Sequence, residues 1–467
     1  MSQPPNPLAG RRSPLPDLQD PFSITPITRP FDARIRPPGS KSLTNRALFL
    51  AALARGTSTL RAPLIDAEDA AVMIEAVRAL GAEVTRVGDD LRVTGVEGRW
   101  QPKAIGPGAG VMLDLRNAGT ATRFLTAGVL LSPVPITIDG SARMRERPIG
   151  ELVDALARLG VRAEYRGRIG CPPVTLTPPA SPAAGAAVTL PTTMSSQVVS
   201  ALLLAAPWLP GGLTVRLIGE ITSKSYVVMT VGLLERLGAT VRTSNDLGVI
   251  RVGPASPAAG LSAFDYTVEP DASGATYFWA AAAIIPGAAC RIEGLDDRSP
   301  QADAKFPDII ERMGVEVRRE AGGIACRGPG TLGPVMADLR DMPDAAMTLA
   351  VVASFAARPS VLRGLRTLRV KESDRIEALR AELAKIGVRV QTEVHGDPDA
   401  ITVTPPSGGV DTGPGVNPVE FETYDDHRMA MSLALVGLRR HAVSIHNPRC
   451  TGKTYPAFWS DLGSLRA

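Results

Sequence analysis

The sequence predicts an α/β fold built from six repeated units whose apolar helices are buried among strands. Two observations carry this prediction. A helix that ends at a glycine and leads into an alternating strand recurs about every 76 residues, with its glycine at Gly81, Gly160, Gly238, Gly314 and Gly387. An apolar helix of small residues, followed by a turn and a β-rich strand, recurs six times with a similar period. Two different patterns that share a period and a phase indicate internal repetition.

The two kinds of helix should lie at different depths. The glycine-terminated helices, such as ALARLG at 155–160, keep an Arg/Glu face and should lie near the surface. Each closing glycine suits the left-handed conformation that follows a helix end. The other helices, such as ALLLAA at 201–206, are apolar on nearly every side and should be buried. Ala-rich helices resemble one another in any Ala-rich chain, but that alternative does not explain the shared period.

The composition is that of an ordinary globular protein, with 44% hydrophobic and 21% charged residues in a chain of 467. A net charge of +4 is too mild to predict a nucleic-acid partner. The four cysteines are scattered without a C-x-x-C pair, which disfavours a disulfide framework or a zinc site. No stretch reaches the roughly 18 apolar residues of a membrane span, and no signal-peptide pattern is present. We therefore expect a cytoplasmic protein without a membrane partner.

A polar cluster precedes each of the six apolar helices. The clusters are PGSKSLTNR (38–46), RNAGTATR (116–123), TMSSQ (193–197), PDASGAT (270–276), DMPDAAMT (341–348) and YDDHRM (424–429). Helix N-termini attract phosphates and carboxylates, because their N–H groups are unpaired and the helix dipole is positive there. If the helices run parallel, the clusters meet at one anion-binding site. Helix capping is the alternative for the Ser, Thr, Asn and Asp residues, but it does not explain Lys41, Arg46, Arg123 and Arg428.

Three further segments carry charge outside these clusters. RMRERP (143–148) places three arginines on a loop, for which a solvated basic loop is the alternative. RVKESDR (369–375) places two cations and a carboxylate at the start of a helix, where cations are disfavoured, and such a violation favours a functional role. GKTYP (452–456) adds a lysine in a turn. A metal site at His427 is disfavoured, because no second histidine stands at ligand spacing.

These motifs together resemble the enolpyruvyl transferases over residues 38–456. The matching segments are PGSKSLTNR, NAGTATR, RMRERP, SSQ, SKSY, PDAAMT, RVKESDR, DDHRMAM and GKTYP. The resemblance implies a two-domain inside-out α/β barrel, in which each domain consists of three βαβαββ repeats with buried helices. It places a C-terminal domain at 22–38 and 268–467, an N-terminal domain at 39–267, and a flexible Pro-rich tail at 1–21.

The resemblance implies transfer of the enolpyruvyl group of phosphoenolpyruvate to the 5-hydroxyl of shikimate 3-phosphate, with release of phosphate. This reaction belongs to the shikimate pathway, which leads to chorismate and the aromatic amino acids. The chemistry needs a carboxylate base, an acid and cations that hold phosphate, and neither a metal nor an organic cofactor. We expect these two small anions as partners, no nucleic acid, and a monomer.

The resemblance also assigns roles to individual residues. The catalytic residues would be Asp344 as the base, Glu372 as the proton carrier, Lys41, Lys453 and His427. Shikimate 3-phosphate would be held by Lys41, Ser42, Arg46, Ser195, Ser196, Gln197, Ser223, Tyr226, Asp344 and Lys371. Phosphoenolpyruvate would be held by Lys41, Gly119, Arg147, Gln197, Arg375, Arg428 and Lys453. Because these residues come from both halves, the two domains must close on the substrates.

Three positions bear on how far the resemblance extends. Phe124 stands where many members have Pro, and Thr367 where some have an Asn that contacts the shikimate phosphate, so substrate and inhibitor tuning stay open. The sibling transferase that acts on UDP-N-acetylglucosamine is the nearest alternative, but it usually has Cys where this chain has Ala142. A non-catalytic anion-binding repeat protein is a second alternative. It would need no carboxylates in the cleft, whereas Asp344 and Glu372 are expected there.

Overall fold

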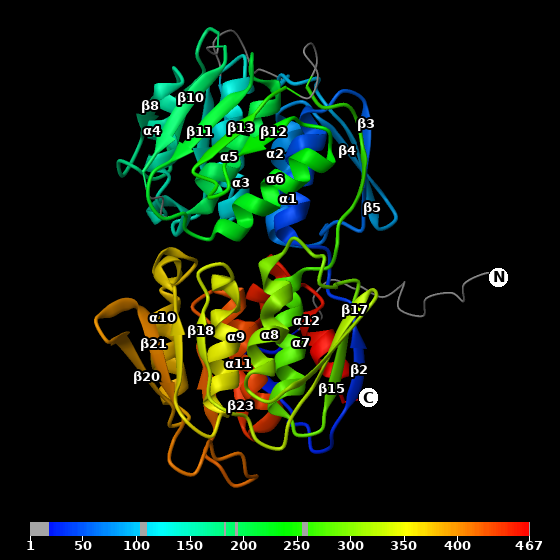
Figure 1. The fold of residues 1–467 in the computed structure, drawn as a ribbon, viewed down its shortest axis with the longest axis vertical. Coiled ribbons are helices and arrows are strands. Elements are labelled where there is room, and N and C mark those ends of the chain that lie inside the picture. The colour runs from blue at the N-terminus through cyan, green and yellow to red at the C-terminus, as the bar shows by residue number, and fades with distance from the viewer. Residues whose placement is uncertain (1–17, 103–109, 182–183, 192–194, 255–259, 467) are drawn as a thin grey trace, which may run out of the picture.

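The computed structural model describes residues 18–102, 110–181, 184–191, 195–254 and 260–466. Two lobes are stacked along the long axis of the molecule (Figure 1), and each has its own hydrophobic core. The core of the N-terminal lobe gathers residues from 43 to 268, and that of the C-terminal lobe gathers residues 18–35 and 272–465. The boundary that we predict at residue 38 falls between these two sets, whereas Val268, with which our predicted C-terminal segment begins, belongs to the N-terminal core. The division into domains stays a proposal.

The strands of the N-terminal lobe form three sheets among the described residues. They are β3 (Thr57–Arg61), β4 (Glu83–Val87), β5 (Asp90–Thr94), β6 (Val111–Asp114), β7 (Ile136–Asp139), β8 (Arg162–Tyr165), β9 (Val174–Thr177), β10 (Ala186–Leu190), β11 (Leu213–Leu217), β12 (Val241–Thr243), β13 (Val249–Val252) and β14 (Asp265–Thr267). The sheet orders are β14-β3-β5-β4, β6-β7-β9-β8 and β10-β11-β13-β12. In each sheet the first pair is parallel and the other two are antiparallel.

The C-terminal lobe repeats this arrangement. Its strands are β1 (Phe22–Ile24), β2 (Asp32–Ile35), β15 (Ala289–Glu293), β16 (Glu316–Glu320), β17 (Gly323–Arg327), β18 (Met336–Asp338), β19 (Ser360–Arg363), β20 (Arg389–Val394), β21 (Asp397–Thr404), β22 (Val419–Phe421) and β23 (Val443–Ile445). The described strands form the sheets β16-β17-β15-β2, β18-β19-β21-β20 and β1-β23-β22. Each of these sheets also contains one parallel pair: β2 with β15, β18 with β19, and β22 with β23.

The helices fall into the two classes that the sequence predicts. The apolar class comprises α1 (Lys41–Leu53), α3 (Gly119–Gly128), α5 (Ser196–Ala205), α7 (Ala272–Ile284), α9 (Ala346–Ser354) and α11 (His427–Arg439). The more polar, glycine-terminated class comprises α2 (Glu68–Ala79), α4 (Gly150–Arg158), α6 (Lys224–Arg236), α8 (Phe306–Glu311) and α10 (Arg375–Ala384), while α12 (Phe458–Ser464) belongs to neither predicted class. Every residue of α3, α7 and α9 is buried, which confirms the predicted depth of the apolar class.

Each helix class has a fixed place in the βαβαββ unit. The unit β6-α3-β7-α4-β8-β9 is contiguous in sequence, and it confirms the predicted repeat. The apolar helices α1, α3 and α5 contact one another in the N-terminal lobe, as do α7, α9 and α11 in the C-terminal lobe. The five predicted closing glycines all have positive φ, between +78° and +106°. Glycine stands at these helix ends because a residue with a Cβ would be strained in that conformation.

Two units receive their first strand from a distant part of the chain. Strand β14 pairs with β3 in the N-terminal lobe, and β2 pairs with β15 in the C-terminal lobe. The chain therefore crosses twice between the lobes, and the two crossings lie side by side. Gly39 and Pro270 form an isolated antiparallel bridge, the N–H of Ser40 donates to the carbonyl of Glu269 (2.8 Å), and the N–H of Asp271 donates to the carbonyl of Pro38 (2.8 Å).

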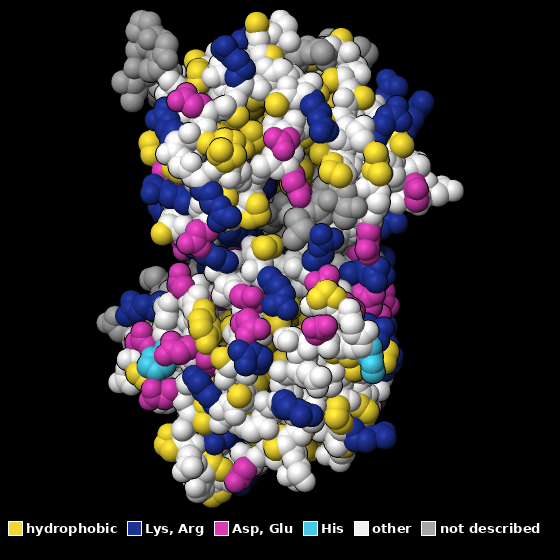
Figure 2. Space-filling model, turned by 90° about the vertical axis from the view of Figure 1, so that its left-hand side faces the viewer, with side chains coloured by type: hydrophobic (Ala, Val, Ile, Leu, Met, Phe, Trp, Pro, Cys, Tyr) yellow, Lys and Arg dark blue, Asp and Glu magenta, His cyan; other side chains and the backbone are white. Residues whose placement is uncertain are grey.

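Only residues 18–21 of the predicted tail at 1–21 belong to the described part of the chain. Of these, Leu18 is buried in the C-terminal core. No helix in the described ranges is long and apolar enough to cross a membrane. On the face shown in Figure 2, cationic and anionic side chains are interspersed over both lobes.

A glycine in α11 allows the N-terminal strand to dock. A Cβ on Gly437 would lie 2.5 Å from the Cβ of Ile24 in β1. Gly437→Ala should therefore destabilise the protein by about 1–3 kcal/mol, since overpacking outweighs the gain of up to about 1 kcal/mol in helix propensity. Gly232→Ala is the matched control, because Gly232 lies in α6 and a Cβ added there would have no atom within 4 Å. It should stabilise by about 0.5–1 kcal/mol. Equal denaturation midpoints for the two variants would contradict this account.

Candidate active site

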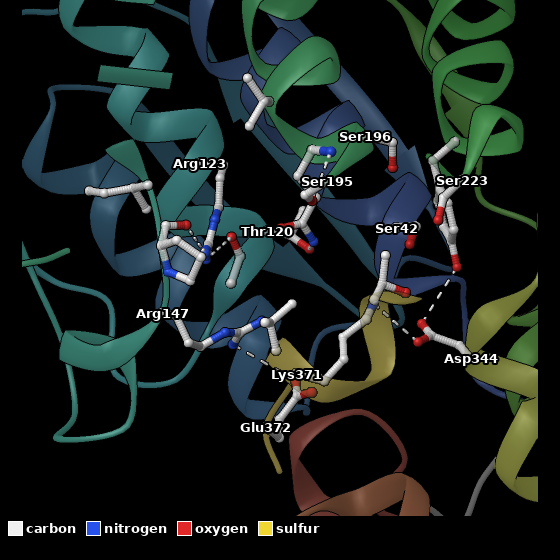
Figure 3. Close-up of a pocket in the computed structure, with 18 of the residues that line it drawn as sticks. Ser42, Thr120, Arg123, Arg147, Ser195, Ser196, Ser223, Asp344, Lys371 and Glu372 are labelled. Atoms are coloured by element: carbon white, nitrogen blue, oxygen red, sulfur yellow. Dashed lines mark hydrogen bonds and ion pairs between the residues drawn. The ribbon is translucent and has the colours of Figure 1, made fainter. Parts of the chain in front are cut away.

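A cavity lies between the lobes, where the apolar helices begin (Figure 3). The first residues of α1, α3, α5 and α11 line it, together with η5 (Pro343–Ala345), which leads into α9. Its lining includes Lys41, Ser42, Arg46, Asp69, Gly119, Thr120, Arg123, Arg147, Ser195, Ser196, Gln197, Ser223, Tyr226, Asp344, Thr367, Lys371, Glu372, Arg375 and Arg428. The predicted convergence of helix starts is thus found for five of the six apolar helices, and α7 adds no lining residue in the described part of the chain.

The guanidinium of Arg375 is the centre of a buried ionic network. Its side chain is only 1% exposed. Nε and Nη2 donate to the two oxygens of Asp426 (2.8 and 3.1 Å), Nη1 donates to Asp344 (3.0 Å), and Nη2 also donates to Glu372 (3.0 Å). Burial disfavours this charge, but Asp426, Glu372 and Asp344 outweigh it and raise the pKa of Arg375 above its usual value. The network joins the starts of α9, α10 and α11.

Asp344 contacts three cations, which come from two segments of the C-terminal lobe. Besides Arg375, its Oδ1 lies 3.3 Å from Nζ of Lys371, and its Oδ2 lies 2.9 Å from Nη2 of Arg428. The hydroxyl of Tyr226, from the other lobe, donates to Oδ2 at 3.5 Å. Burial would raise the pKa of Asp344, but Arg428, Lys371 and Arg375 together hold it well below its usual value. The carboxyl is therefore ionised at neutral pH.

Glu372 is the second buried carboxylate at the cavity. Nζ of Lys453 donates to its Oε1 at 2.8 Å, and Nη1 of Arg147, from the N-terminal lobe, lies 4.0 Å from the same oxygen. Burial would raise the pKa of Glu372, but Lys453, Arg375 and Arg147 lower it well below its usual value. Lys453 also donates to the carbonyl of Asn117 across the lobes (3.0 Å), so it joins both halves of the site.

His427 is buried behind these groups. Its Nδ1 lies 3.7 Å from Asp426, and neither ring nitrogen has a hydrogen-bond partner among the described residues. Burial is the largest effect on its pKa, which lies well below the usual value, so the ring is neutral. The described residues contain no group of three or more His, Cys, Asp or Glu that could hold a metal ion.

The N-terminal lobe contributes the opposite wall of the cavity. Nζ of Lys41 lies 3.2 Å from the carboxylate of Asp69, which begins α2 together with Glu68. Ser195 is the N-cap of α5 and accepts from the N–H of Gln197 (3.2 Å), whose side chain in turn donates to Thr120 (3.3 Å). These contacts direct hydroxyl and amide groups toward the cavity, as Figure 3 shows for Ser195 and Thr120.

Arg46 lines the cavity but directs its donors into the protein. It donates to Thr230 (2.8 Å), to Ser200 (3.2 Å) and to the carbonyls of Ser42 (2.9 Å) and Tyr226 (3.2 Å). Burial lowers its pKa to about 10. These contacts tie α1, α5 and α6 together beneath the predicted shikimate 3-phosphate site.

The two lobes are in contact around the cavity. Arg143 reaches across and donates to the carbonyls of Lys371 (2.8 Å) and Glu372 (3.0 Å). Arg340 and Glu220 form an ion pair between the lobes (2.6 Å), and Ser225 donates its N–H to Asp341 (3.3 Å). The arrangement is a closed one, in which both predicted proton-transfer residues face the same cavity.

This geometry can be compared with known proteins. The family model described as EPSP synthase (3-phosphoshikimate 1-carboxyvinyltransferase) matches residues 26–462. The chain belongs to the EPSP synthase family. Among curated members, the 3-phosphoshikimate 1-carboxyvinyltransferase of Thiobacillus denitrificans is 42% identical over 439 residues, covering 92% of this chain and 96% of that protein. That of Ralstonia pickettii is 40% identical over 442 residues, covering 93% and 96%.

A solved structure supports the same family. EPSP synthase from Acinetobacter baumannii superposes with a TM-score of 0.77 at 26% identity, covering 96% of this chain and 98% of that chain. The family and the two-domain α/β fold that the sequence predicts are therefore confirmed. The division of roles among individual residues stays a prediction, to which the contacts described above give a geometric basis.

Most of the residues predicted from the EPSP synthase motifs meet at this one cavity. The exceptions are Lys453, which reaches it through Glu372, and His427, which lies behind it. Of the two departures from the family pattern, Phe124 is fully buried, with Arg46 above its ring at 5.3 Å. Thr367 lines the cavity, and its buried hydroxyl has no partner among the described residues, so it is free to meet a ligand.

Other residues of this EPSP synthase site are not predicted by the motifs. Asp69 pairs with Lys41, Asp426 pairs with Arg375, and Arg143 joins the lobes. Asp426 stands in the DDHRMAM segment, but the resemblance assigns it no role, and nothing in the sequence shows that it pairs with Arg375. Asp69 stands at an ordinary helix start, so no signal in the sequence distinguishes it from a residue that merely favours the helix dipole.

Asp303 should make the free energy of unfolding depend on pH. Burial, and then the charge of Asp344, raise the pKa of its carboxyl from 3.8 to about 7. The folded state holds a proton that the unfolded chain loses above about pH 4, so the free energy of unfolding should fall as the pH rises toward about 7, by at most ~1.4 kcal/mol per pH unit. The hydroxyl of Ser273 donates to Asp303, and an Asn at this position can still accept that bond.

Asp303→Asn should therefore flatten this part of the stability profile. The variant should also be more stable than the parent at about pH 8, where the buried charge of Asp303 is fully developed. Urea denaturation at several pH values checks both expectations. A parental slope in the variant would show that Asp303 does not titrate in this range.

Proposed function

We propose that this chain transfers the enolpyruvyl group of phosphoenolpyruvate to the 5-hydroxyl of shikimate 3-phosphate and releases phosphate. The observation that carries the proposal is the pair of largely buried carboxylates, Asp344 and Glu372, each held by several cations at one cavity between the lobes. Membership of the EPSP synthase family supports the same reaction. An anion-binding protein without catalysis would have no use for two buried carboxylates beside its cations.

The reaction needs one proton to leave and another to arrive. The 5-hydroxyl loses its proton as its oxygen attacks C2 of phosphoenolpyruvate, while the methylene carbon C3 gains one. Elimination then expels phosphate and removes a proton from the new methyl group, which restores the double bond. A positioned carboxylate and a positioned acid each contribute to such transfers.

Asp344 is suited to the hydroxyl proton. Tyr226 and Lys371, both predicted to hold shikimate 3-phosphate, lie at its two oxygens. Its low pKa makes it a weak base in the unliganded site. When a substrate anion binds Arg428 and Lys371, those cations interact less with Asp344, and its pKa rises toward the range in which it can accept a proton.

Glu372 is suited to deliver the proton that C3 of phosphoenolpyruvate gains. Lys453 donates to its Oε1, and Arg147, from the other lobe, lies 4.0 Å from the same oxygen. Both cations are predicted to bind phosphoenolpyruvate. The anionic phosphate and carboxylate of that substrate would draw these cations away from Glu372. Glu372 then gains proton affinity in the presence of substrate, as a proton carrier requires.

The remaining assignments concern the residues that would bind each substrate. We place phosphoenolpyruvate against Lys41, Gly119, Arg147, Gln197, Arg375, Arg428 and Lys453. We place shikimate 3-phosphate against Lys41, Ser42, Arg46, Ser195, Ser196, Gln197, Ser223, Tyr226, Asp344 and Lys371, with Arg46 acting mainly through the residues that it holds. We also propose that the enzyme acts in the cytoplasm as a monomer without a cofactor.

The direct test is phosphate release from phosphoenolpyruvate by the purified 467-residue chain. Release should require shikimate 3-phosphate, because the attacking hydroxyl comes from that substrate. UDP-N-acetylglucosamine in its place should give no release, which separates the proposal from the sibling activity. No release with shikimate 3-phosphate would refute the proposed function.

Glu372→Gln keeps the shape of the side chain but removes its titratable proton. The variant should turn over at least about 100-fold more slowly, on the usual contribution of a positioned acid or base. Glu377→Gln is the matched control, since Glu377 lies in the first turn of α10 and pairs with the exposed Arg380. It should retain parental turnover. Steady-state rates at saturating substrate measure the turnover of both variants. Near-parental turnover of Glu372→Gln would reject the role of Glu372 as a proton carrier.

A further inference from the structure

Two successive residues before α11 adopt a conformation that side chains disfavour. Tyr424 has φ of +56° and Asp425 has φ of +54°, both in the left-handed region. Neither is a glycine, and Tyr424 is a bulky residue for which this region is uncommon. Such strain persists only where the surroundings hold it, and it occurs most often at functional sites. The contacts of this turn therefore show what holds it and what it positions.

Each strained residue is tethered by its own side chain. The hydroxyl of Tyr424 donates to Oε1 of Glu382 (2.7 Å), and Oδ1 of Asp425 accepts from the side-chain amide of Asn447 (3.0 Å). Glu382 lies on α10 and is 1% exposed. Its Oε2 accepts from Nζ of Lys385 (2.6 Å) and from the N–H of Glu422 (2.9 Å). One buried carboxylate therefore holds both the strained turn and the segment that enters it.

The turn leads directly into the ionic network of the active site. Asp426 follows it, caps α11 and binds the guanidinium of Arg375 with both oxygens. Arg428, two residues further, binds Asp344 at 2.9 Å. Arg375 begins the same helix that carries Glu382. Helix α10 thus fixes the start of α11 at two points, through Arg375 inside the site and through Glu382 outside it.

We propose that Glu382 is a positioning residue for the phosphoenolpyruvate site, which holds the strained Tyr424–Asp425 turn and thereby sets Asp426 and Arg428. The inference rests on the proposed function, in which Arg428 and Arg375 bind phosphoenolpyruvate. If the tether is lost, the turn can relax, and the two guanidinium groups lose their common alignment. Binding of phosphoenolpyruvate should weaken, while the proton-transfer groups remain in place.

Tyr424→Phe tests the tether with the smallest change. Tyr424 is 45% exposed, so removing its hydroxyl disturbs no core packing. The KM for phosphoenolpyruvate should rise about 2- to 10-fold, the equivalent of one hydrogen bond. The kcat and the KM for shikimate 3-phosphate should stay near their parental values. Loss of stability alone would lower the amount of active enzyme and leave both KM values unchanged.

A second pair of variants separates the tether from the strain. Tyr424→Ala and Tyr424→Gly both lose the hydroxyl, but only alanine keeps a Cβ in the left-handed conformation. Glycine needs no tether to remain in that conformation, so Tyr424→Gly should have a lower KM for phosphoenolpyruvate than Tyr424→Ala. If the variants acted only by making the turn more flexible, Tyr424→Gly would have the higher KM for phosphoenolpyruvate, because glycine is the more flexible residue.

The outcomes distinguish this inference from the function on which it rests. Absence of turnover in the parental enzyme would refute the proposed function. Parental turnover combined with unchanged KM values for phosphoenolpyruvate in Tyr424→Phe and Tyr424→Ala would refute the role of Glu382 alone. A selective rise of that KM in both variants, reduced in Tyr424→Gly, would support it.

Discussion

The buried guanidinium of Arg375 is the contact on which the arrangement of the active site depends. It binds Asp344, Glu372 and Asp426, which come from three different segments of the C-terminal lobe. Asp426 is fully buried, whereas Glu372 and Asp344 keep 7% and 13% of their side-chain surface exposed. A buried charge that loses its partner costs about 3–5 kcal/mol. The first turn of a helix disfavours a cation, yet the surrounding carboxylates outweigh that effect. One cation therefore aligns the starts of α9, α10 and α11.

The two crossings of the chain between the lobes explain why these groups meet residues of the other half. Because β2 and β14 each complete a sheet in the lobe that the chain is leaving, the two crossings are short and lie side by side. The starts of the apolar helices in both lobes then face one cavity. Lys453 and Arg143 use this placement to contact the opposite lobe. Contacts between the lobes thus bring the cationic groups of both halves and the carboxylates of Asp344 and Glu372 together at one cavity.

Much of this architecture could be predicted from the sequence, because local physics determines it. Gly81 and the four other closing glycines mark helix ends, since only glycine adopts the left-handed conformation there without strain. The burial of the apolar helices could be predicted from their apolar composition. The charges of Lys371 and Glu372 pointed to the site, but the prediction that they lie on the first turn of a helix was wrong, because Asp374 caps α10 and the helix begins only at Arg375. Tertiary pairing gives no such local signal. The partnership of Asp426 with Arg375, the inward direction of Arg46 and the left-handed Tyr424 depend on contacts between segments far apart in the chain.

The central claim is that Glu372, held by Arg375 and Lys453, gives a proton to C3 of phosphoenolpyruvate and later takes one back, so that the transfer proceeds by addition and elimination. The most direct measurement is the reaction in D2O, followed by proton NMR of the methylene group in the product. Addition creates a methyl group with one solvent-derived hydrogen, and elimination removes one of its three hydrogens. The account therefore predicts deuterium in the methylene group of the product. A product formed at the parental rate with only protium at that carbon would contradict it.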